Sequence, residues 1–222
     1  MVAGGFDGRS PLAGAERYDP ATGRWSSAGT MAVPRLMAAA ARLPGGDVLV
    51  VGDGNTASRY DPATNSWTTT DGMVASPVLP SVVALPGGEV LVAGGESDGH
   101  AVAAAELYHP ATGAWTSAGT LRGARAGAGA IALSNGEVLV AGGTAETISP
   151  SGAVTLAVRS SADLYALDAQ MRLAAPAGTG PVAAPSGISA SEYGGIFGGL
   201  AGIGLLGLLG VGLLGYRRRY RR

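Results

Sequence analysis

The sequence predicts an all-β fold, a partial β-propeller of about three to four four-stranded antiparallel blades, followed by one C-terminal transmembrane helix. Three observations predict it. One phrase of eleven residues occurs three times, over residues 15–25, 57–67 and 105–115, so the chain is built from repeats. A Val-Leu-Val run that ends in Gly-Gly, or a remnant of that run, accompanies the copies. Residues 194–216 carry no charge and are numerous enough to cross a bilayer.

The first half of each repeat predicts two strands, as residues 78–95 illustrate. Residues 78–85 are apolar and rich in β-branched side chains, which favours a strand. Pro86-Gly87-Gly88 then supplies a tight reversal, because glycine adopts positive φ without strain. The run Glu89-Val90-Leu91-Val92-Ala93 is almost continuously apolar, so we expect a second strand that is buried on both faces and ends at Gly94-Gly95.

The second half of the repeat predicts two more short strands. Ala105-Glu106-Leu107-Tyr108 is the third, and Ala114-Trp115-Thr116-Ser117 is the fourth. Between them, His109-Pro110-Ala111-Thr112-Gly113 predicts a turn in which proline fixes φ and glycine closes the reversal. Four short antiparallel strands in about 40–50 residues are typical of one propeller blade.

These residues form the pattern of the kelch repeat. From Met1 to about Leu173 the chain resembles bacterial kelch-repeat proteins of the galactose-oxidase-like propeller superfamily. The resemblance implies that the glycine pair lets the backbone pass close to the tyrosine and that the tryptophan packs toward the neighbouring blade. The residues expected in these structural roles are Tyr18, Trp25, Tyr60, Trp67, Tyr108, Trp115, Gly94, Gly95, Gly142 and Gly143.

The repeats also depart from the kelch pattern. Asp53 replaces the second glycine, so the blade around it is expected to be looser or re-aimed. Arg35 and Arg125 match an arginine that family copies often carry after the tryptophan strand, but Pro77 stands at the matching place between them. In the last unit Arg172 occupies the place of the tryptophan, so that blade is expected to be degenerate at its outer strand.

The repeats and the composition together predict the domain organisation. Its parts are a half blade at 1–35, blades at 36–77 and 78–125, a degenerate blade at 126–173, an Ala/Gly/Pro/Ser linker at 174–193, a transmembrane helix at 194–216 and a basic cytoplasmic tail at 217–222. Propellers normally have four to eight blades. We therefore expect the chain to be the C-terminal part of a longer propeller. The alternative is that the chain self-associates to complete one.

The C-terminal residues predict a membrane anchor. As a helix, the 23 residues of 194–216 would span about 34 Å. The residues predicted to define the anchor are Gly194, Tyr216, Arg217, Arg218 and Arg219. Arginines favour the cytoplasmic side, so we expect a single-pass protein of the cell membrane with an extracytoplasmic N-terminal domain and a cytoplasmic C-terminus. The alternatives are a cytosolic, tail-anchored body, since Met1-Val2-Ala3-Gly4-Gly5 resembles no export signal, and a sorting tail that a protease removes.

Composition excludes several functions. The chain contains no cysteine, so it has no disulfide and no thiol nucleophile, and it lacks the cysteine that the copper site of galactose-oxidase-like enzymes requires. Residues 1–193 carry 10 arginines and 16 acidic residues, which gives no electrostatic case for nucleic-acid binding. Asp19 and Asp61 are interpreted as turn caps. We predict no catalytic residue, no cofactor and no metal site.

Binding remains as the predicted function. The connections between the second and third strands, and between one blade and the next, lie on one face of a propeller, and the connection over residues 144–161 is the longest. The candidate ligand-face residues are Arg35, Arg125, Glu96, Asp98 and His100; the alternative for each is a solvated loop charge or a packing arginine. We predict a surface-displayed, membrane-anchored module that binds protein or glycan. The alternatives are a non-catalytic portion of a galactose-oxidase-like enzyme and a cytosolic tail-anchored scaffold.

Overall fold

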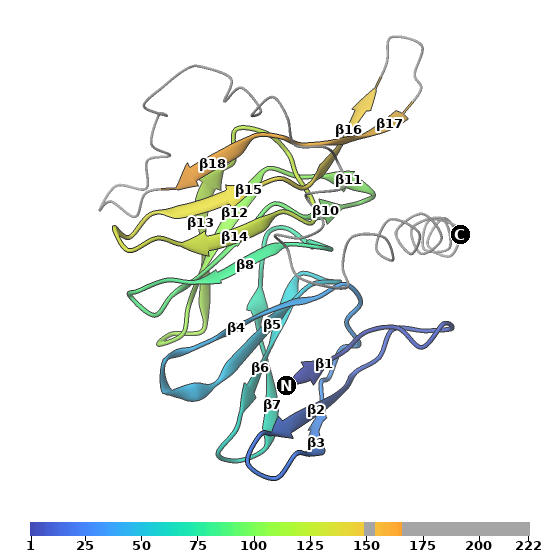
Figure 1. The fold of residues 1–222 in the computed structure, drawn as a ribbon, viewed down its shortest axis with the longest axis vertical. Helices are drawn as coiled ribbons and strands as arrows, with labels where there is room; N and C mark the ends of the chain where they lie inside the picture. The colour runs from blue at the N-terminus through green and yellow to red at the C-terminus, as the bar shows by residue number, and fades with distance from the viewer. Residues whose placement is uncertain (149–153, 166–222) are drawn as a thin grey trace. The chain divides into compact units, whose positions relative to one another are not determined.

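The computed structural model describes residues 1–148 and 154–165, and within these ranges the chain is all-β (Figure 1). The strands form several antiparallel sheets. The helical structure in the described residues is limited to one short 3-10 turn, η1 (Pro44–Gly46), which forms the hairpin connection of the second sheet.

Four sheets of three or four strands follow one another along the chain, and we call them blades 1 to 4. Blade 1 contains β1 (Val2–Ala3), β2 (Gly14–Asp19) and β3 (Arg24–Thr30), in that spatial order. Blade 2 contains β4 (Ala39–Arg42), β5 (Val48–Val51), β6 (Thr56–Asp61) and β7 (Ser66–Gly72), in that order. Blade 3 contains β8 (Ser81–Ala84), β9 (Val90–Ala93), β12 (Ala104–His109) and β13 (Ala114–Thr120), in that order. Blade 4 contains β14 (Gly129–Ala132), β15 (Val138–Ala141) and β18 (Ala162–Tyr165), in that order.

Two small hairpins are inserted between the second and third strands of blades 3 and 4. In blade 3 the hairpin pairs β10 (Glu96–Ser97) with β11 (His100–Ala101). In blade 4 it pairs β16 (Thr144–Ile148) with β17 (Val154–Val158). The second hairpin falls in the connection that the sequence identifies as the longest, over residues 144–161.

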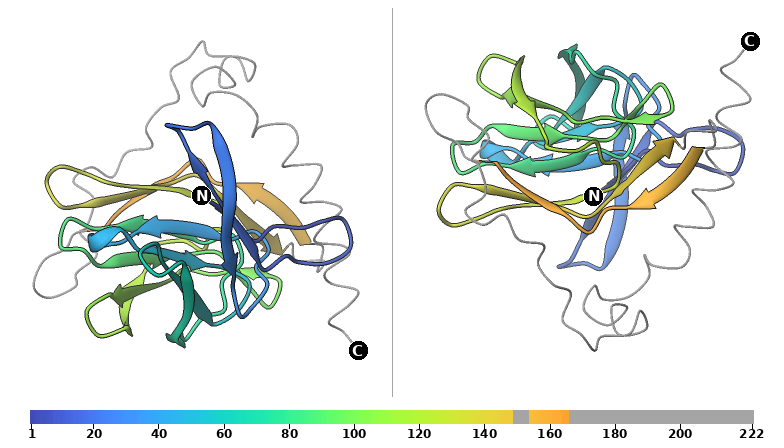
Figure 2. Two further views of the ribbon diagram at one scale, coloured as in Figure 1. Left: turned by 90° about the horizontal axis from the view of Figure 1, so that it is seen from below. Right: turned by 90° about the horizontal axis from the view of Figure 1, so that it is seen from above.

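Neighbouring blades lie side by side. The first strand of blade 3, β8, lies against β4 of blade 2 and also against β14 of blade 4. Toward the other end of each sheet, β7 lies against both β3 and β13. Figure 2 shows the sheets of blades 2, 3 and 4 following one another from two further directions. Adjacent blades therefore bury the faces that they turn toward one another.

The repeated phrase forms the third and fourth strands of the first three blades. Across each strand pair the tyrosine stands directly opposite the tryptophan, as Tyr60 stands opposite Trp67. In all three blades the pairing register shifts just before this point, at a β-bulge. The fourth strand carries the extra residue, and the single residue opposite it on the third strand is always an alanine that is at most 5% exposed, namely Ala15, Ala57 or Ala105.

The turn that joins these two strands is closed by an aspartate. Asp61 Oδ1 accepts a hydrogen bond from the backbone N–H of Ala63 (2.8 Å), and Oδ2 accepts one from Thr64 Oγ1 (2.8 Å). Asp19 makes the same two contacts in blade 1. The threonine hydroxyl and the backbone N–H lower the pKa of each carboxyl, because both stabilise its charged form. These aspartates are the turn caps that their sequence context indicates.

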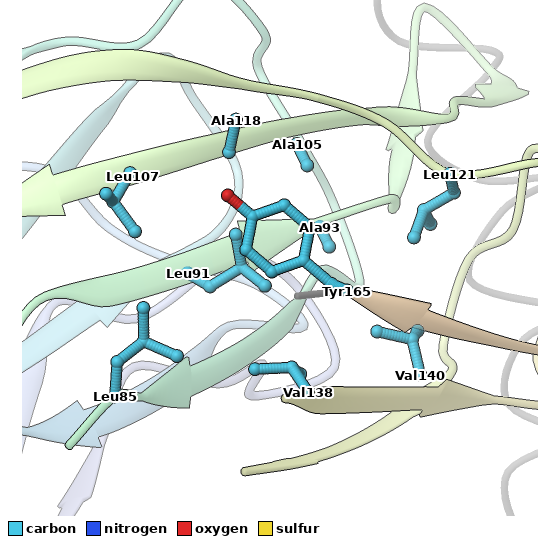
Figure 3. Close-up of a cluster of buried hydrophobic side chains, with 10 residues drawn as sticks. All are labelled: Leu85, Leu91, Ala93, Ala105, Leu107, Ala118, Leu121, Val138, Val140 and Tyr165. Carbon is cyan, nitrogen blue, oxygen red and sulfur yellow. The ribbon is translucent and has the colours of Figure 1, made fainter. Parts of the chain in front are cut away.

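The core lies between the blades and is built from cross-strand rows of side chains. One face of a blade presents a valine–tyrosine–tryptophan row to the preceding blade; the rows are Val48–Tyr60–Trp67, Val90–Tyr108–Trp115 and, without a tryptophan, Val138–Tyr165. The opposite face presents an aliphatic row, such as Val83–Leu91–Leu107, to the following blade. Figure 3 shows Tyr165 of blade 4 pointing into the leucines of blade 3. Each fully buried valine or leucine stabilises the fold by about 1.5–3 kcal/mol.

The predicted fold class is wrong in one part, the C-terminal transmembrane helix. No helix in the described residues is long and apolar enough to cross a membrane, and these residues are all-β. The predicted span at 194–216 and its marker residues Gly194, Tyr216, Arg217, Arg218 and Arg219 lie outside the described residues. Hydropathy identified that segment from composition alone. The extracytoplasmic location was inferred from the same segment, and the described residues do not test it.

Candidate functional site

The repeated tyrosines and tryptophans join one blade to the next. The ring centroids of Tyr60 and Trp67 lie 5.0 Å apart, and those of Tyr108 and Trp115 also lie 5.0 Å apart. Trp67 Nε1 donates a hydrogen bond to the carbonyl oxygen of Ala28 in blade 1 (2.6 Å). Trp115 Nε1 likewise donates to Thr70 Oγ1 in blade 2 (3.2 Å). These contacts place the indoles at the joints between blades.

Tyr18 and Trp25 belong to the same repeated phrase, but they are more exposed than their counterparts in blades 2 and 3. Their rings are also paired, with centroids 5.3 Å apart. Tyr18 is 47% exposed and Trp25 is 53% exposed, whereas Tyr60 and Tyr108 are 2% and 1% exposed. The structure therefore buries two of the three predicted core tyrosines and leaves the first on the surface.

The glycine pairs form the ends of the second strands, where the backbone of the next connection passes closely. Gly94 and Gly95 both have positive φ (65° and 103°), and Gly95 N–H donates to the carbonyl oxygen of Arg125 (2.8 Å). Gly142 and Gly143 repeat this arrangement in blade 4, where a Cβ on Gly143 would lie 2.8 Å from Ala126 O. Glycine is needed at Gly94, Gly95 and Gly143 because a Cβ there would meet backbone atoms.

Arg35 is buried and connects blade 1 to blade 2. Its carbonyl oxygen accepts the N–H of Gly5 in blade 1 (2.8 Å). Its guanidinium donates to Gly52 O (2.8 Å), Ser58 Oγ (3.1 Å) and Thr56 Oγ1 (3.3 Å) in blade 2. Arg35 is 0% exposed. Every one of these contacts is made inside the molecule.

Arg125 connects blade 3 to blade 4 in the same way. Its guanidinium donates to the carbonyl oxygens of Gly142 and Ser161 (2.9 Å each), and it forms a buried ion pair with Asp163 at 2.8 Å. Arg125 is 1% exposed and Asp163 is 4% exposed. The structure therefore corrects the predicted ligand-face role of Arg35 and Arg125, because both guanidinium groups are consumed in joining blades.

The joint between blades 2 and 3 has no such arginine, and the carboxylate of Glu106 joins the two blades instead. The sequence analysis did not predict this role of Glu106. Buried Pro77 stands at the arginine position, and its carbonyl oxygen accepts the N–H of Asp53 (3.1 Å). Glu106 is 7% exposed, and its two carboxylate oxygens accept the backbone N–H groups of Val74 (2.9 Å) and Ala75 (3.0 Å). A signal for Glu106 was present in the sequence. Glu106 stands at the same position of the repeat as Ser58 and Asp163, and those two residues belong to the blades that follow Arg35 and Arg125.

Asp53 stands where the pattern requires a second glycine, and it has the positive φ (55°) of that position. Burial raises the pKa of its carboxyl, although the backbone N–H of Leu36 and the charge of Arg35 act in the opposite direction. Burial likewise lowers the pKa of Arg35, and the charge of Asp53 opposes that change. Arg35 lies in the connection between blades 1 and 2, and Asp53 follows the second strand of blade 2.

Replacing Asp53 with asparagine is expected to remove one contribution that destabilises the fold as pH rises. The folded-state pKa of Asp53 is raised, so the ionised carboxyl disfavours the fold. The contribution of Asp53 to wild-type stability should therefore fall as pH rises from about 4, the unfolded pKa, through the folded pKa. An asparagine is tolerated at positive φ and lacks this loss, because its amide does not ionise. Urea midpoints measured from about pH 3 to 7 should diverge in favour of the variant as pH rises.

The matched control is Asp61→Asn, which has the opposite sign. The pKa of Asp61 is lowered, so its carboxylate stabilises the fold above the unfolded pKa, and this contribution is lost as pH falls through the folded pKa. The control should lose stability relative to the wild type near neutral pH and approach it in acid. Parallel pH profiles for Asp53→Asn and the wild type would contradict the assignment of Asp53.

The two inserted hairpins lie in connections that the sequence associates with binding, and they contact each other. His100 Nδ1 on β11 lies 2.7 Å from Glu146 Oε2 on β16, and β11 lies against β16 (Figure 1). On β17, Leu156 is 58% exposed and Val158 is 80% exposed. We call β10, β11, β16 and β17 together the hairpin face. Of the predicted ligand residues, Glu96, Asp98 and His100 belong to it, with Asp98 and His100 exposed and Glu96 partly buried.

Among the described residues one row joins a hydroxyl, an imidazole and a carboxylate: His109 Nδ1 lies 2.9 Å from Glu89 Oε1, and His109 Nε2 lies 2.8 Å from Thr116 Oγ1. No cluster of three or more His, Asp or Glu side chains able to hold a metal ion occurs in the described part of the chain.

A shallow depression of about 440 Å³ lies between the first hairpin turns of blades 2 and 3. Its lining includes Arg42, Leu43, Pro44 and Pro86, and Arg42 is its one charged side chain. This lining offers no general base or nucleophile.

The comparison with known families agrees with the blade structure. Residues 1–32 match the kelch motif. The match covers the strands β1, β2 and β3, which form blade 1. Blades 2 and 3 repeat the tyrosine–tryptophan pairing of this kelch motif in the same register. No curated protein matches the chain. The superfamily and the bacterial origin that the resemblance implies stay predictions.

Proposed function

We propose that the chain is a non-catalytic, protein-binding kelch module whose contact surface is the hairpin face. The kelch motif suggests a β-propeller that binds protein, and kelch repeats are generally binding modules without catalytic activity. The observation that carries the proposal is the exposure of Leu156 and Val158 on a hairpin held against its neighbour. Soluble proteins seldom expose adjacent large apolar side chains on a strand without a partner.

The hairpin face has the composition of a protein contact. Leu156 and Val158 are two positions apart on β17, so their side chains lie on the same side of the hairpin. Asp98 and His100 are exposed on the neighbouring hairpin. Apolar side chains at the centre with polar groups at the rim are typical of protein interfaces. The residues of the two hairpins include no Tyr, Trp or Phe, so a glycan, which was the other predicted ligand class, is less favoured than a protein.

The blades provide the rigidity that such a contact needs. The base of the β16–β17 hairpin is tied to the connection between blades 3 and 4, because Thr144 exchanges backbone hydrogen bonds with Ala126 (2.8 and 2.9 Å). The β10–β11 hairpin is tied in the same way, since Glu96 exchanges hydrogen bonds with Val78 (2.7 and 2.8 Å). Two hairpins anchored on packed sheets bind with less loss of conformational entropy than free loops would.

The test replaces the apolar centre of this face. In the double variant Leu156→Asp/Val158→Asp, affinity for a protein ligand is expected to fall at least about 30-fold, as when an interface hot spot is removed. The control is Ala111→Asp in the exposed turn between β12 and β13. Proteins retained by the immobilised wild type and by the control, but lost by the double variant, are then purified and titrated against all three chains. Equal affinities for the three chains would refute the proposal.

A further inference from the structure

Every internal joint of the molecule is made by two complementary faces. The face toward the preceding blade carries the tyrosine row, and Tyr60, Tyr108 and Tyr165 in these rows are only 2%, 1% and 2% exposed. The face toward the following blade carries an aliphatic row, in which Leu91 and Leu107 of blade 3 are 1% and 4% exposed. The covering of an aliphatic row by a tyrosine row is therefore the interaction that this chain uses repeatedly.

Blade 1 presents an exposed tyrosine row. Tyr18 is 47% exposed, Trp25 is 53% exposed, and Val2 on β1 is 58% exposed. These side chains point away from blade 2, because Ala3 and Ala15, which alternate with them, pack against Tyr60. We call Val2, Tyr18 and Trp25 the tyrosine face of blade 1.

Blade 4 presents an uncovered aliphatic row on its far side. Ile131, Leu139 and Leu164 stand opposite one another on β14, β15 and β18. Ile131 is 59% exposed and Leu164 is 38% exposed. They point away from blade 3, because Val138, Val140 and Tyr165 alternate with them and fill the joint with that blade. We call Ile131, Leu139 and Leu164 the aliphatic face of blade 4.

We propose that the tyrosine face of blade 1 in one copy packs on the aliphatic face of blade 4 in a second copy. The occupant is a second copy because the described residues carry one exposed face of each kind, and each kind is covered by the other at the joints between described blades. The exposure of both faces shows that they do not cover one another within one copy. The contact is continuous with the established packing of blade on blade.

The geometry of this contact has a definite consequence for assembly. The two copies use different surfaces, so the interface is heterologous. Such an interface forms a closed ring when its rotation closes, and otherwise an open chain of copies. Both faces are already formed in the single copy, so association requires no refolding. The proposal is independent of the hairpin face, which contains none of these residues.

The first experiment measures the association of the full chain by sedimentation velocity over a range of concentrations. The wild type is expected to form dimers or larger assemblies. Trp25→Arg and Leu164→Arg should each weaken association at least about tenfold, although they lie at opposite ends of the blade array. Ala63→Arg, in an exposed turn of blade 2, is the control and should associate like the wild type. A monomeric wild type, or association unaffected by both arginine variants, would overturn the proposal.

A second experiment uses the absence of cysteine from the chain, because any disulfide must then come from an engineered residue. Internal joints place an aliphatic leucine beside a tyrosine, as Leu107 and Tyr165 show (Figure 3). Chains carrying Tyr18→Cys and Leu164→Cys are therefore expected to form a disulfide-linked dimer under mild oxidation when mixed, and much less when each is oxidised alone. Equally strong linkage in the separate Tyr18→Cys sample would show a face-to-face contact and refute the head-to-tail arrangement.

Discussion

Replacing Arg125 with methionine is expected to lower the free energy of unfolding by about 3–5 kcal/mol. The guanidinium is 1% exposed and forms an ion pair with Asp163, which is 4% exposed. It also donates to the carbonyl oxygens of Gly142 and Ser161. Methionine fills similar space but leaves a buried carboxylate without a cation and removes the guanidinium donor from the carbonyl oxygen of Gly142; the carbonyl oxygen of Ser161 keeps the N–H of Gly142 as a donor. The midpoint of urea unfolding, followed by tryptophan fluorescence, measures the loss.

Two further variants make the result specific to the buried pair. Arg122→Met removes an exposed arginine three residues away and should change stability by no more than about 0.5 kcal/mol. The double variant Arg125→Met/Asp163→Leu removes both charges, and it should recover most of the loss because no uncompensated charge remains. If Arg125→Met behaved like Arg122→Met, the guanidinium could not be holding blades 3 and 4 together.

Replacing Gly94 with alanine is expected to destabilise the protein by about 2–5 kcal/mol, the sum of a backbone cost and a packing cost. Gly94 has φ +65°, where an alanine loses about 1–2 kcal/mol. In addition, its Cβ would collide with the carbonyl oxygen of Arg125 and reach Leu121 Cδ1 at 3.4 Å. The colliding oxygen belongs to the backbone, so the obstruction cannot be relieved by a rotamer change.

The matched control for this variant is Gly113→Ala. Gly113 has φ +76°, but no atom lies within 4 Å of the Cβ it would carry. The control therefore incurs only the backbone cost, and the difference between the two urea midpoints isolates the collision at the joint. Equal midpoints would mean that the backbone near Arg125 yields freely, contrary to the close packing described.

The strands and the tyrosine–tryptophan pairing were predictable because they depend on local patterns. The phrase from Tyr60 to Trp67 contains its own turn, with Asp61 as the cap, so the two aromatic residues stand opposite each other wherever the phrase folds. The long connection after β15 was also visible as a spacing between repeats. The exposure of Tyr18 was not predictable from its phrase, since burial depends on whether another blade lies against that face.

The joints between blades were predicted less well, because they depend on which segments meet in space. Arg35 and Arg125 lie in connections, and connections usually carry solvated charges, so a ligand contact was expected. Instead, the backbone carbonyl of each arginine is hydrogen-bonded to the second glycine of the preceding blade's pair. Its guanidinium reaches into the following blade. Glu106 was missed because its partners are the backbone N–H groups of Val74 and Ala75, which leave no trace in a pattern of side chains.

The three joints differ in how much apolar surface they bury. The buried cluster between blades 1 and 2 consists of Ala15, Ala28 and Tyr60, whereas the clusters at the later joints are made largely of leucine and valine. In a linear array each unit is supported by its neighbours alone, so local opening begins where that support is weakest. Blade 1 should therefore fray ahead of the others, and its amide protons should exchange with solvent while blades 3 and 4 remain closed.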